Sequence, residues 1–202
     1  VEVTGYVQSI EQISDERRYS FDEIAGLKKY DLFMPDEGLR AAARKRIDEI
    51  SESKDTAGGI LELRVRGLKS GFGSCMSYSE KLDAHLACAL MSVQAIKGVE
   101  VGLGFEAARR AGSLVHDQIY YRGGAFVRET NNAGGIEGGM SNGEDIVLRA
   151  AMKPIPTLMR GLDTVDFDTK EACRAATERS DVCSVCACEI ILESVLCFAL
   201  AE

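Results

Sequence analysis

One lysine stands in a setting that could bind an anion. Residues 131–157 read NNAGGIEGGMSNGEDIVLRAAMKPIPT, and Lys153 lies directly before the first of two prolines in this stretch. Glycines let a ligand approach the main chain closely, and Pro154 and Pro156 stiffen the segment that carries Lys153 and Thr157. The pattern indicates either an anion site built from backbone amides and one ammonium group, or a hairpin loop followed by a strand that ends at a proline. These residues alone favour neither reading.

A second pattern could bind a metal ion. Three cysteines stand close together near the C-terminus: Cys183, Cys186 and Cys188. A structural zinc site needs further ligands at comparable spacing, and the two histidines, His85 and His116, stand apart from them and from each other. We therefore expect no metal site. Seven cysteines in a chain that can fold without disulfides predict reduced thiols and a cytoplasmic protein, with the cysteines of a helix at 181–200 largely buried.

A third pattern could bind a dinucleotide. Gly102, Gly104 and Ala107 match the G-x-G-x-x-A form of the Rossmann fingerprint. That fold also needs an acidic residue about twenty positions later, at the end of a second strand. Glu129 is only loosely placed for this role, because it precedes the glycine-rich loop in a segment without a clear strand. The motif alone is weak evidence for an oxidoreductase, and no P-loop motif occurs.

Alternating strands and helices would position these motifs. Strands are expected at three places: 1–10, 60–68 and 144–153. The second strand is expected to bury Ile60 and Val65 and to expose Glu62 and Arg64, and the third has Ile146, Leu148 and Ala150 on one side.

The helix signals are caps and apolar stripes. A helix is expected at 37–52 with Asp36 as its N-cap, and a capping box of Ser77 and Glu80 predicts the start of a second helix. The apolar C-terminal segment carries Glu189 and Glu193 four residues apart. Each would cost roughly 2 to 3 kcal/mol at a bilayer centre, so we expect a core helix with one polar stripe and no membrane span.

Composition places the chain among ordinary globular proteins. It has 202 residues, 46% hydrophobic and 28% charged, which suits a single domain with a sizeable core. A net charge of -8 argues against nucleic acid as a partner. The chain starts at Val1 and enters a strand-like VEVTGYV at once, without a signal peptide, so we expect that an N-terminal part is missing.

Three segments in the same order resemble chorismate synthase: residues 81–108, 131–157 and 178–194, with likeness from about Thr56 to the end. The resemblance implies an α+β fold, a βαβ sandwich with antiparallel sheets and outer helices, of which residues 1–202 are a single-domain C-terminal portion. It also implies a homotetramer. The family converts 5-enolpyruvylshikimate 3-phosphate into chorismate and phosphate, the last step of the shikimate pathway. This trans-1,4 elimination needs reduced FMN without consuming it, and NADPH is a possible reductant.

The resemblance also implies site residues. FMN contacts are expected at Gln94, Ala95, Gly138, Lys153, Pro154, Ile155, Pro156, Thr157 and Arg179. Asp181 resembles the family's acidic residue near the reactive edge of the flavin, although an acidic residue at the start of a helix is also a good N-cap. In this family the strand before Gly102 belongs to the core, so the G-x-G match loses its dinucleotide meaning.

The chain also departs from the family pattern. A Gly-Glu-Ser-His type stretch and an Arg-Ser-Ser-Ala-Arg type stretch are absent, and with them two catalytic histidines and most of the substrate-binding arginines. His85 and His116 have no matching context, so we expect these residues alone to be inactive. Two alternatives stay open: a dinucleotide-dependent oxidoreductase, and a non-catalytic assembly fragment.

Overall fold

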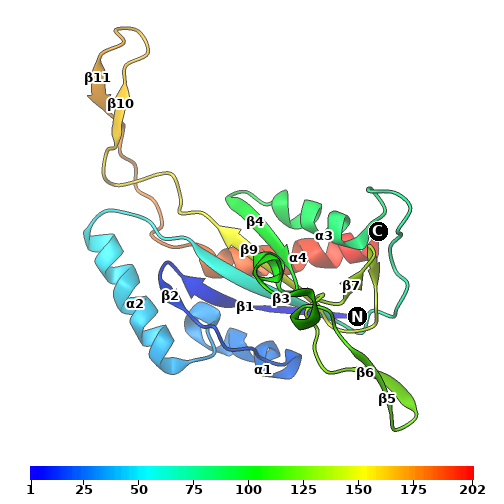
Figure 1. The fold of residues 1–202 in the computed structure, drawn as a ribbon. Helices are drawn as coiled ribbons and strands as arrows, with labels where there is room; N and C mark the ends of the chain where they lie inside the picture. The colour runs from blue at the N-terminus through cyan, green and yellow to red at the C-terminus, as the bar shows by residue number, and fades with distance from the viewer.

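A five-stranded antiparallel sheet forms the centre of the protein in a computed structural model of residues 1–202 (Figure 1). Its strand order is β2-β1-β3-β9-β4. The bounds are β1 Glu2–Ile10, β2 Ile13–Ser14, β3 Gly59–Arg66, β9 Ile146–Met152 and β4 Ile96–Val101. Because β3 and β9 lie inside the sheet, they bring together segments that are far apart in the sequence.

Alternation along the strands decides which face is buried. In β9, Ile146, Leu148 and Ala150 are all fully buried, as their spacing predicts. The prediction for Ile60 in β3 was wrong, because this side chain is 38% exposed. A strand has a period of two, so Ile60 shares a face with Arg64 and lies opposite the core face of Leu61.

Two helices cover the core face of the sheet, and α4 lies behind the sheet in Figure 1. These are α3, Leu82–Met91, and α4, Val185–Ala201. The other face carries α1, Phe21–Ala25, whose Ile24 packs with Leu27 against the buried Tyr6 of β1. The helix α2, Glu37–Glu52, packs beside β2, and Asp36 caps it by accepting a hydrogen bond from the Leu39 amide, as predicted.

The predicted capping box at α3 was wrong. The helix begins at Leu82, and the N-cap residue Lys81 makes no side-chain cap. The Ser77 hydroxyl instead meets the Ser79 hydroxyl at 2.8 Å. Contact with the glycine loop sets the start of the helix, because the Leu82 amide donates to the Gly139 carbonyl at 2.8 Å.

The helix α4 has an unusual distribution of side chains. Glu189 is fully buried against β1, whereas Ile190, Ile191 and Phe198 are exposed. Its first residue is Val185, later than the position 181 expected from the sequence. No helix in the structure combines the length and the apolar character needed to cross a bilayer.

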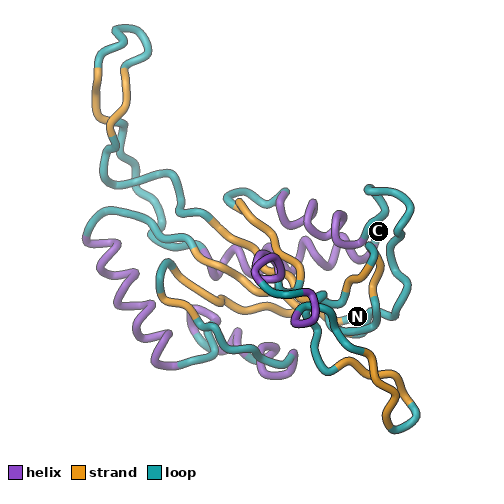
Figure 2. The backbone as a smooth tube through the Cα atoms, in the orientation of Figure 1, coloured by secondary structure: helices purple, strands orange, loops and turns teal.

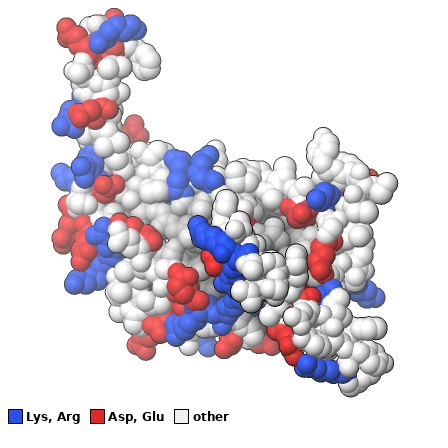
Figure 3. All heavy atoms as spheres, viewed as in Figure 1, with Lys and Arg blue, Asp and Glu red and all other residues white.

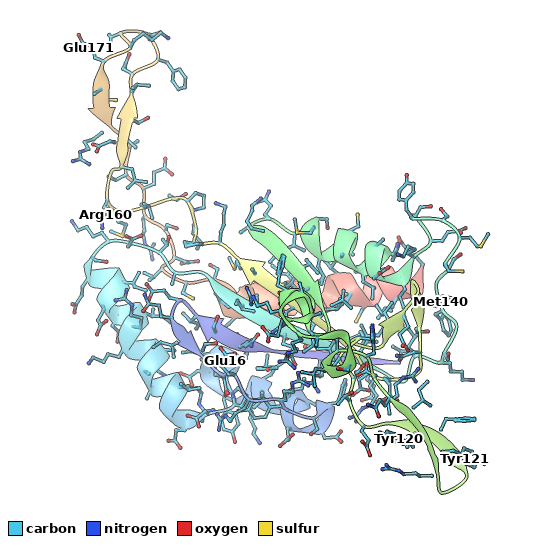
Figure 4. All side chains as sticks on the ribbon, in the orientation of Figure 1. Glu16, Tyr120, Tyr121, Met140, Arg160 and Glu171 are labelled. Carbon is cyan, nitrogen blue, oxygen red and sulfur yellow. The ribbon has the colours of Figure 1, made fainter.

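Three small hairpins complete the strands, and the first and third of them project from the body in the backbone trace (Figure 2). They are β5 Ile119–Arg122 with β6 Ala125–Arg128, β7 Ile136–Glu137 with β8 Met140–Ser141, and β10 Asp163–Val165 with β11 Ala172–Arg174. Figure 4 labels Tyr120 and Tyr121 on the first, and it labels Arg160 near the base and Glu171 near the tip of the long third one. Four short 3-10 turns complete the structure: η1 Leu27–Lys29, η2 Asp31–Phe33, η3 Gly104–Arg109 and η4 Gly112–Leu114.

The G-x-G-x-x-A segment has no dinucleotide-binding context. Strand β4 runs antiparallel to β9 and is followed by the short η3 turn. A Rossmann site needs a parallel βαβ unit with an α-helix directly after the glycines. The dinucleotide alternative therefore lacks its structural basis.

Candidate functional site

Several predicted site residues meet at the end of the sheet where β9 finishes. Lys153 follows β9, and its amide donates to the Ala95 carbonyl at 2.9 Å. Ala95 has a φ of +72°, a left-handed conformation that is uncommon outside glycine. This turn carries Gln94 and Ala95 from the end of α3 to a position beside Lys153.

A second set of backbone contacts brings the C-terminal motif to the same place. The Ala57 amide donates to the Val182 carbonyl at 2.8 Å, and the Thr56 hydroxyl donates to the Ile155 carbonyl at 2.7 Å. Residues 56–57 thus join the segment after Lys153 to the segment before α4. We call Ala95, 153–157 and 181–183, together with residues 56–57, the strand-end cluster.

Two cations in or next to the strand-end cluster lack protein partners, Lys153 within it and Arg179 two residues before Asp181. Lys153 is half-buried and Arg179 is exposed, and neither side chain forms an ion pair or a hydrogen bond. Arg160, by contrast, pairs with Asp55 at 3.4 Å. A half-buried ammonium group without a counter-ion suits an external anion, since the protein has not neutralised it. These residues therefore fit the phosphate group of a nucleotide-like cofactor.

Asp181 is exposed, and it is not the cap of α4. The N-cap position is Ser184, and no side chain makes a capping hydrogen bond at the start of this helix. Residues 181–183 cannot be helical, because Ala57 and Cys183 form a parallel β-bridge. The capping alternative for Asp181 was wrong, and the Asp181 carboxylate has no hydrogen bond that would give it another structural role.

Gly138 lies away from the other predicted FMN contacts. It shares with Gly139 the two-residue turn of the β7–β8 hairpin, where both have positive φ angles of 60° and 85°. This hairpin adjoins the start of β9, whereas the strand-end cluster adjoins its end. The seven residues of β9 separate the two places by roughly 20 Å at about 3.3 Å per residue.

Two amides at the start of the glycine loop are occupied by the protein itself. The Asp117 carboxylate accepts from the Asn132 and Ala133 amides at 2.7 and 2.9 Å and from the Thr130 hydroxyl at 2.5 Å. Burial raises the pKa of Asp117, but these hydrogen bonds outweigh it and hold the pKa below its usual range. The start of the loop thus binds an anionic group that the protein itself supplies, the Asp117 carboxylate. Asp117 was not identified from the sequence, because no residue near it indicates that its hydrogen-bond donors follow the β5–β6 hairpin.

Packing also explains why the loop is rich in glycine. A Cβ atom on Gly134 would lie 2.4 Å from the Gly102 amide nitrogen. Residues 134 and 102 thus approach each other too closely for any side chain. At Gly138, by contrast, a Cβ would meet no atom within 4 Å.

The cysteine predictions hold only in part. All seven cysteines are free, and burial raises the pKa of Cys188 to about 11 and of Cys186 to about 12. Cys197 is exposed, contrary to the expectation for this helix, because it lies on the outer face of α4 beside Phe198. The structure contains no group of three metal-ligating side chains in a metal-binding arrangement.

A buried carboxylate pair lies beneath β1. Glu189 is fully buried with no hydrogen bond to either carboxylate oxygen, and the Lys28 ammonium lies 3.6 Å from it. Lys28 pairs more closely with Glu193. Burial first, and the neighbouring Glu193 second, raise the pKa of Glu189 to about 8.

These features define an α+β protein with a candidate anion site at one end of an antiparallel sheet. Comparison with known proteins places it further: the sequence profile of chorismate synthase matches residues 1–202. The chain belongs to the chorismate synthase family.

Individual relatives agree with this placement. The chain is 50% identical over 212 residues to chorismate synthase of Geobacter sulfurreducens, covering 100% of this chain and 54% of that protein. It is 57% identical over 160 residues to chorismate synthase of Caldanaerobacter subterraneus subsp. tengcongensis, covering 79% and 46%. A crystal structure of chorismate synthase superposes with a TM-score of 0.78 at 34% identity, over 99% of this chain and 55% of that one. The chain spans about half the length of the curated relatives it matches.

Proposed function

We propose that this chain is the C-terminal portion, as a single domain, of an enzyme that converts 5-enolpyruvylshikimate 3-phosphate into chorismate. Family membership over all 202 residues supports the proposal. The observation that carries it is the strand-end cluster, where backbone hydrogen bonds bring Ala95, Lys153 and residues 181–183 together. These segments are separate in the sequence, yet the resemblance assigns residues of all three to one flavin site.

Lys153 and Arg179 would hold the phosphate of reduced FMN in this proposal. Both are cations without counter-ions, and Pro154 and Pro156 restrict the backbone next to Lys153. Reduced FMN, when bound, supplies the electron-rich flavin that the elimination needs. Asp181 lies next to this site with a carboxylate free of protein partners, and we assign it the role of holding a proton during turnover. Gly138 would contribute to a flavin site only from the far end of the sheet.

The two histidines of this chain do not complete an active site. His85 Nε2 lies 3.1 Å from the Ala199 carbonyl, which joins α3 to the end of α4. His116 lies in the segment after η4, beside the glycine loop. We therefore propose that the 202 residues alone do not turn over, and that the complete cytoplasmic enzyme acts as a homotetramer, with NADPH as a possible reductant.

The test measures chorismate formation and FMN affinity in the full-length protein under anaerobic conditions with reduced FMN. Lys153→Ala and Arg179→Ala are each expected to weaken FMN binding by about 1 to 3 kcal/mol, the range for a lost charge-assisted hydrogen bond. Arg174→Ala is the matched control, since Arg174 is an exposed arginine on β11. Absence of chorismate formation would refute the function, and unchanged FMN affinity in both variants would refute the site.

A further inference from the structure

Two free thiols in a Cys-x-x-Cys arrangement lie where α4 begins. Cys183 directly precedes the N-cap residue Ser184, and Cys186 is the second residue of the helix. Residues three apart on an α-helix have Cα atoms about 5 Å apart. A disulfide needs a Cα separation of about 4.4 to 6.8 Å, so the start of the helix gives this pair a suitable spacing.

The two side chains share one environment. Both are half-buried and pack against the same main core. The two thiols are also electrostatic neighbours, because burial first and the Cys183 thiol second raise the pKa of Cys186. Cys188 is fully buried two residues further on, and a two-residue step on a helix turns its side chain away from that of Cys186. Cys183 and Cys186 are therefore each other's natural partners.

The two thiols differ in how strongly the thiolate is disfavoured. Burial raises the pKa of Cys183, and the Val185 amide at the start of the helix opposes this rise by favouring the thiolate. For Cys186, the acidic groups of Glu189 and Asp31 instead add to the effect of burial on its pKa. Since the thiolate is the nucleophile in thiol chemistry, Cys183 is the better attacking group.

Cys183 belongs to the strand-end cluster. It forms the parallel β-bridge with Ala57, whose amide donates to the neighbouring Val182 carbonyl. Figure 3 shows basic and acidic side chains interspersed around the base of the β10–β11 arm, so charge of one sign does not shield this end of the protein. The cations without protein partners, Lys153 and Arg179, favour a negatively charged reagent there.

We propose that Cys183 and Cys186 are a reversible thiol–disulfide exchange site, oxidised to an intramolecular disulfide by a small disulfide such as glutathione disulfide. The Cys183 thiolate attacks one sulfur of the reagent, which forms a mixed disulfide and releases one glutathione thiolate. The Cys186 thiolate then attacks the Cys183 sulfur and releases the second. The two cysteines lose two protons and two electrons, and the reagent leaves as two glutathione thiols.

The raised thiol pKa values have a consequence for this exchange. Because burial disfavours both thiolates, the exchange is slow at neutral pH. For the same reason no stabilised thiolate favours the reduced form, so the disulfide is stable once it has formed.

The test equilibrates the 202-residue chain without oxygen in mixtures of reduced glutathione and glutathione disulfide. Free thiols are then blocked with N-ethylmaleimide, and the chain is cut after Arg179 and Glu189 for mass spectrometry. The peptide 180–189 contains Cys183, Cys186 and Cys188, so the oxidised form should carry one maleimide group in place of three. The equilibrium constant for this disulfide should be about tenfold larger in the native chain than in concentrated urea, because the start of α4 holds the two thiols together.

Substitutions identify the two sulfurs. Cys183→Ser and Cys186→Ser should each abolish the intramolecular disulfide, whereas Cys188→Ala, the matched control, should leave its equilibrium constant unchanged. Circular dichroism of each variant checks that the fold is intact. Three results would overturn the proposal: a native chain that stays reduced in excess glutathione disulfide, an equilibrium constant in urea equal to or above the native one, or loss of the disulfide in Cys188→Ala.

Discussion

Replacing Glu189 by glutamine should remove most of the loss in unfolding free energy that Glu189 causes as the pH rises. Glu189 is fully buried, and its pKa is raised to about 8 by burial and by Glu193, with Lys28 as the only opposing charge nearby. An unfolded glutamate titrates near its ordinary pKa of about 4.3. Between these two values the folded protein holds a proton that the unfolded chain releases. Stability from this group is therefore full at low pH and is lost as the pH rises towards 8.

The magnitude follows from proton linkage. One proton gives a slope of at most about 1.4 kcal/mol per pH unit, so raising the pH from 5 to 7.5 should cost about 3 kcal/mol. Glu189→Gln cannot ionise and resembles the protonated acid in size. We expect the Glu189→Gln variant and the unsubstituted chain to have the same free energy of unfolding near pH 5. At pH 7.5 we expect the variant to be the more stable of the two.

Urea unfolding at four pH values between 5 and 8 measures this difference. Glu52→Gln is the matched control, because Glu52 is an exposed glutamate at the end of α2 without an ion pair. Parallel curves of unfolding free energy against pH for the original chain and Glu189→Gln would refute the reasoning, because Glu189 would then be ionised in the fold.

Three further predictions concern single side chains. In the full-length protein, Asp181→Asn should lower kcat by on the order of 10² or more with an unchanged melting temperature, because Asp181 caps no helix; normal turnover would exclude a proton-handling role. Asp117→Asn should lower stability in urea unfolding by about 1 to 3 kcal/mol, because one loop amide loses its acceptor; unchanged stability would show that the loop holds without it. A thiol reagent should label Cys197 quickly and Cys188 slowly in the native chain, and equal rates would contradict the burial of Cys188.

Local patterns predicted those elements whose cause is local. The alternation of Ile146, Leu148 and Ala150 identified the core face of β9, and Asp36 identified the start of α2, because each signal lies within the element itself. Ile60 was assigned to the wrong face because its type was weighed above its position in the period.

Features that depend on distant partners could not be predicted. Glu189 was expected in a polar stripe of a core helix, and nothing beside it in the sequence shows that Lys28 and Gly5 will meet it inside the fold. The candidate site was predicted through family resemblance, whereas glycine content alone gave no sign that Asp117 accepts from the Asn132 and Ala133 amides at the start of the loop.

The long β10–β11 arm leaves the body after residue 157 and returns just before Arg179, so both of its ends lie at the strand-end cluster (Figure 1). Near the base of the arm, the Ala175 amide donates to the Leu162 carbonyl at 2.8 Å. This hydrogen bond joins the two sides of the arm before β10 and β11 project outward. Doubling the length of a flexible loop adds only about 0.6 kcal/mol to its closure cost. The arm can therefore grow, shrink or accept an inserted tag at its tip near Glu171 without moving Lys153 relative to Asp181, which makes the tip an attachment point for a reporter that lies well away from this site (Figure 4).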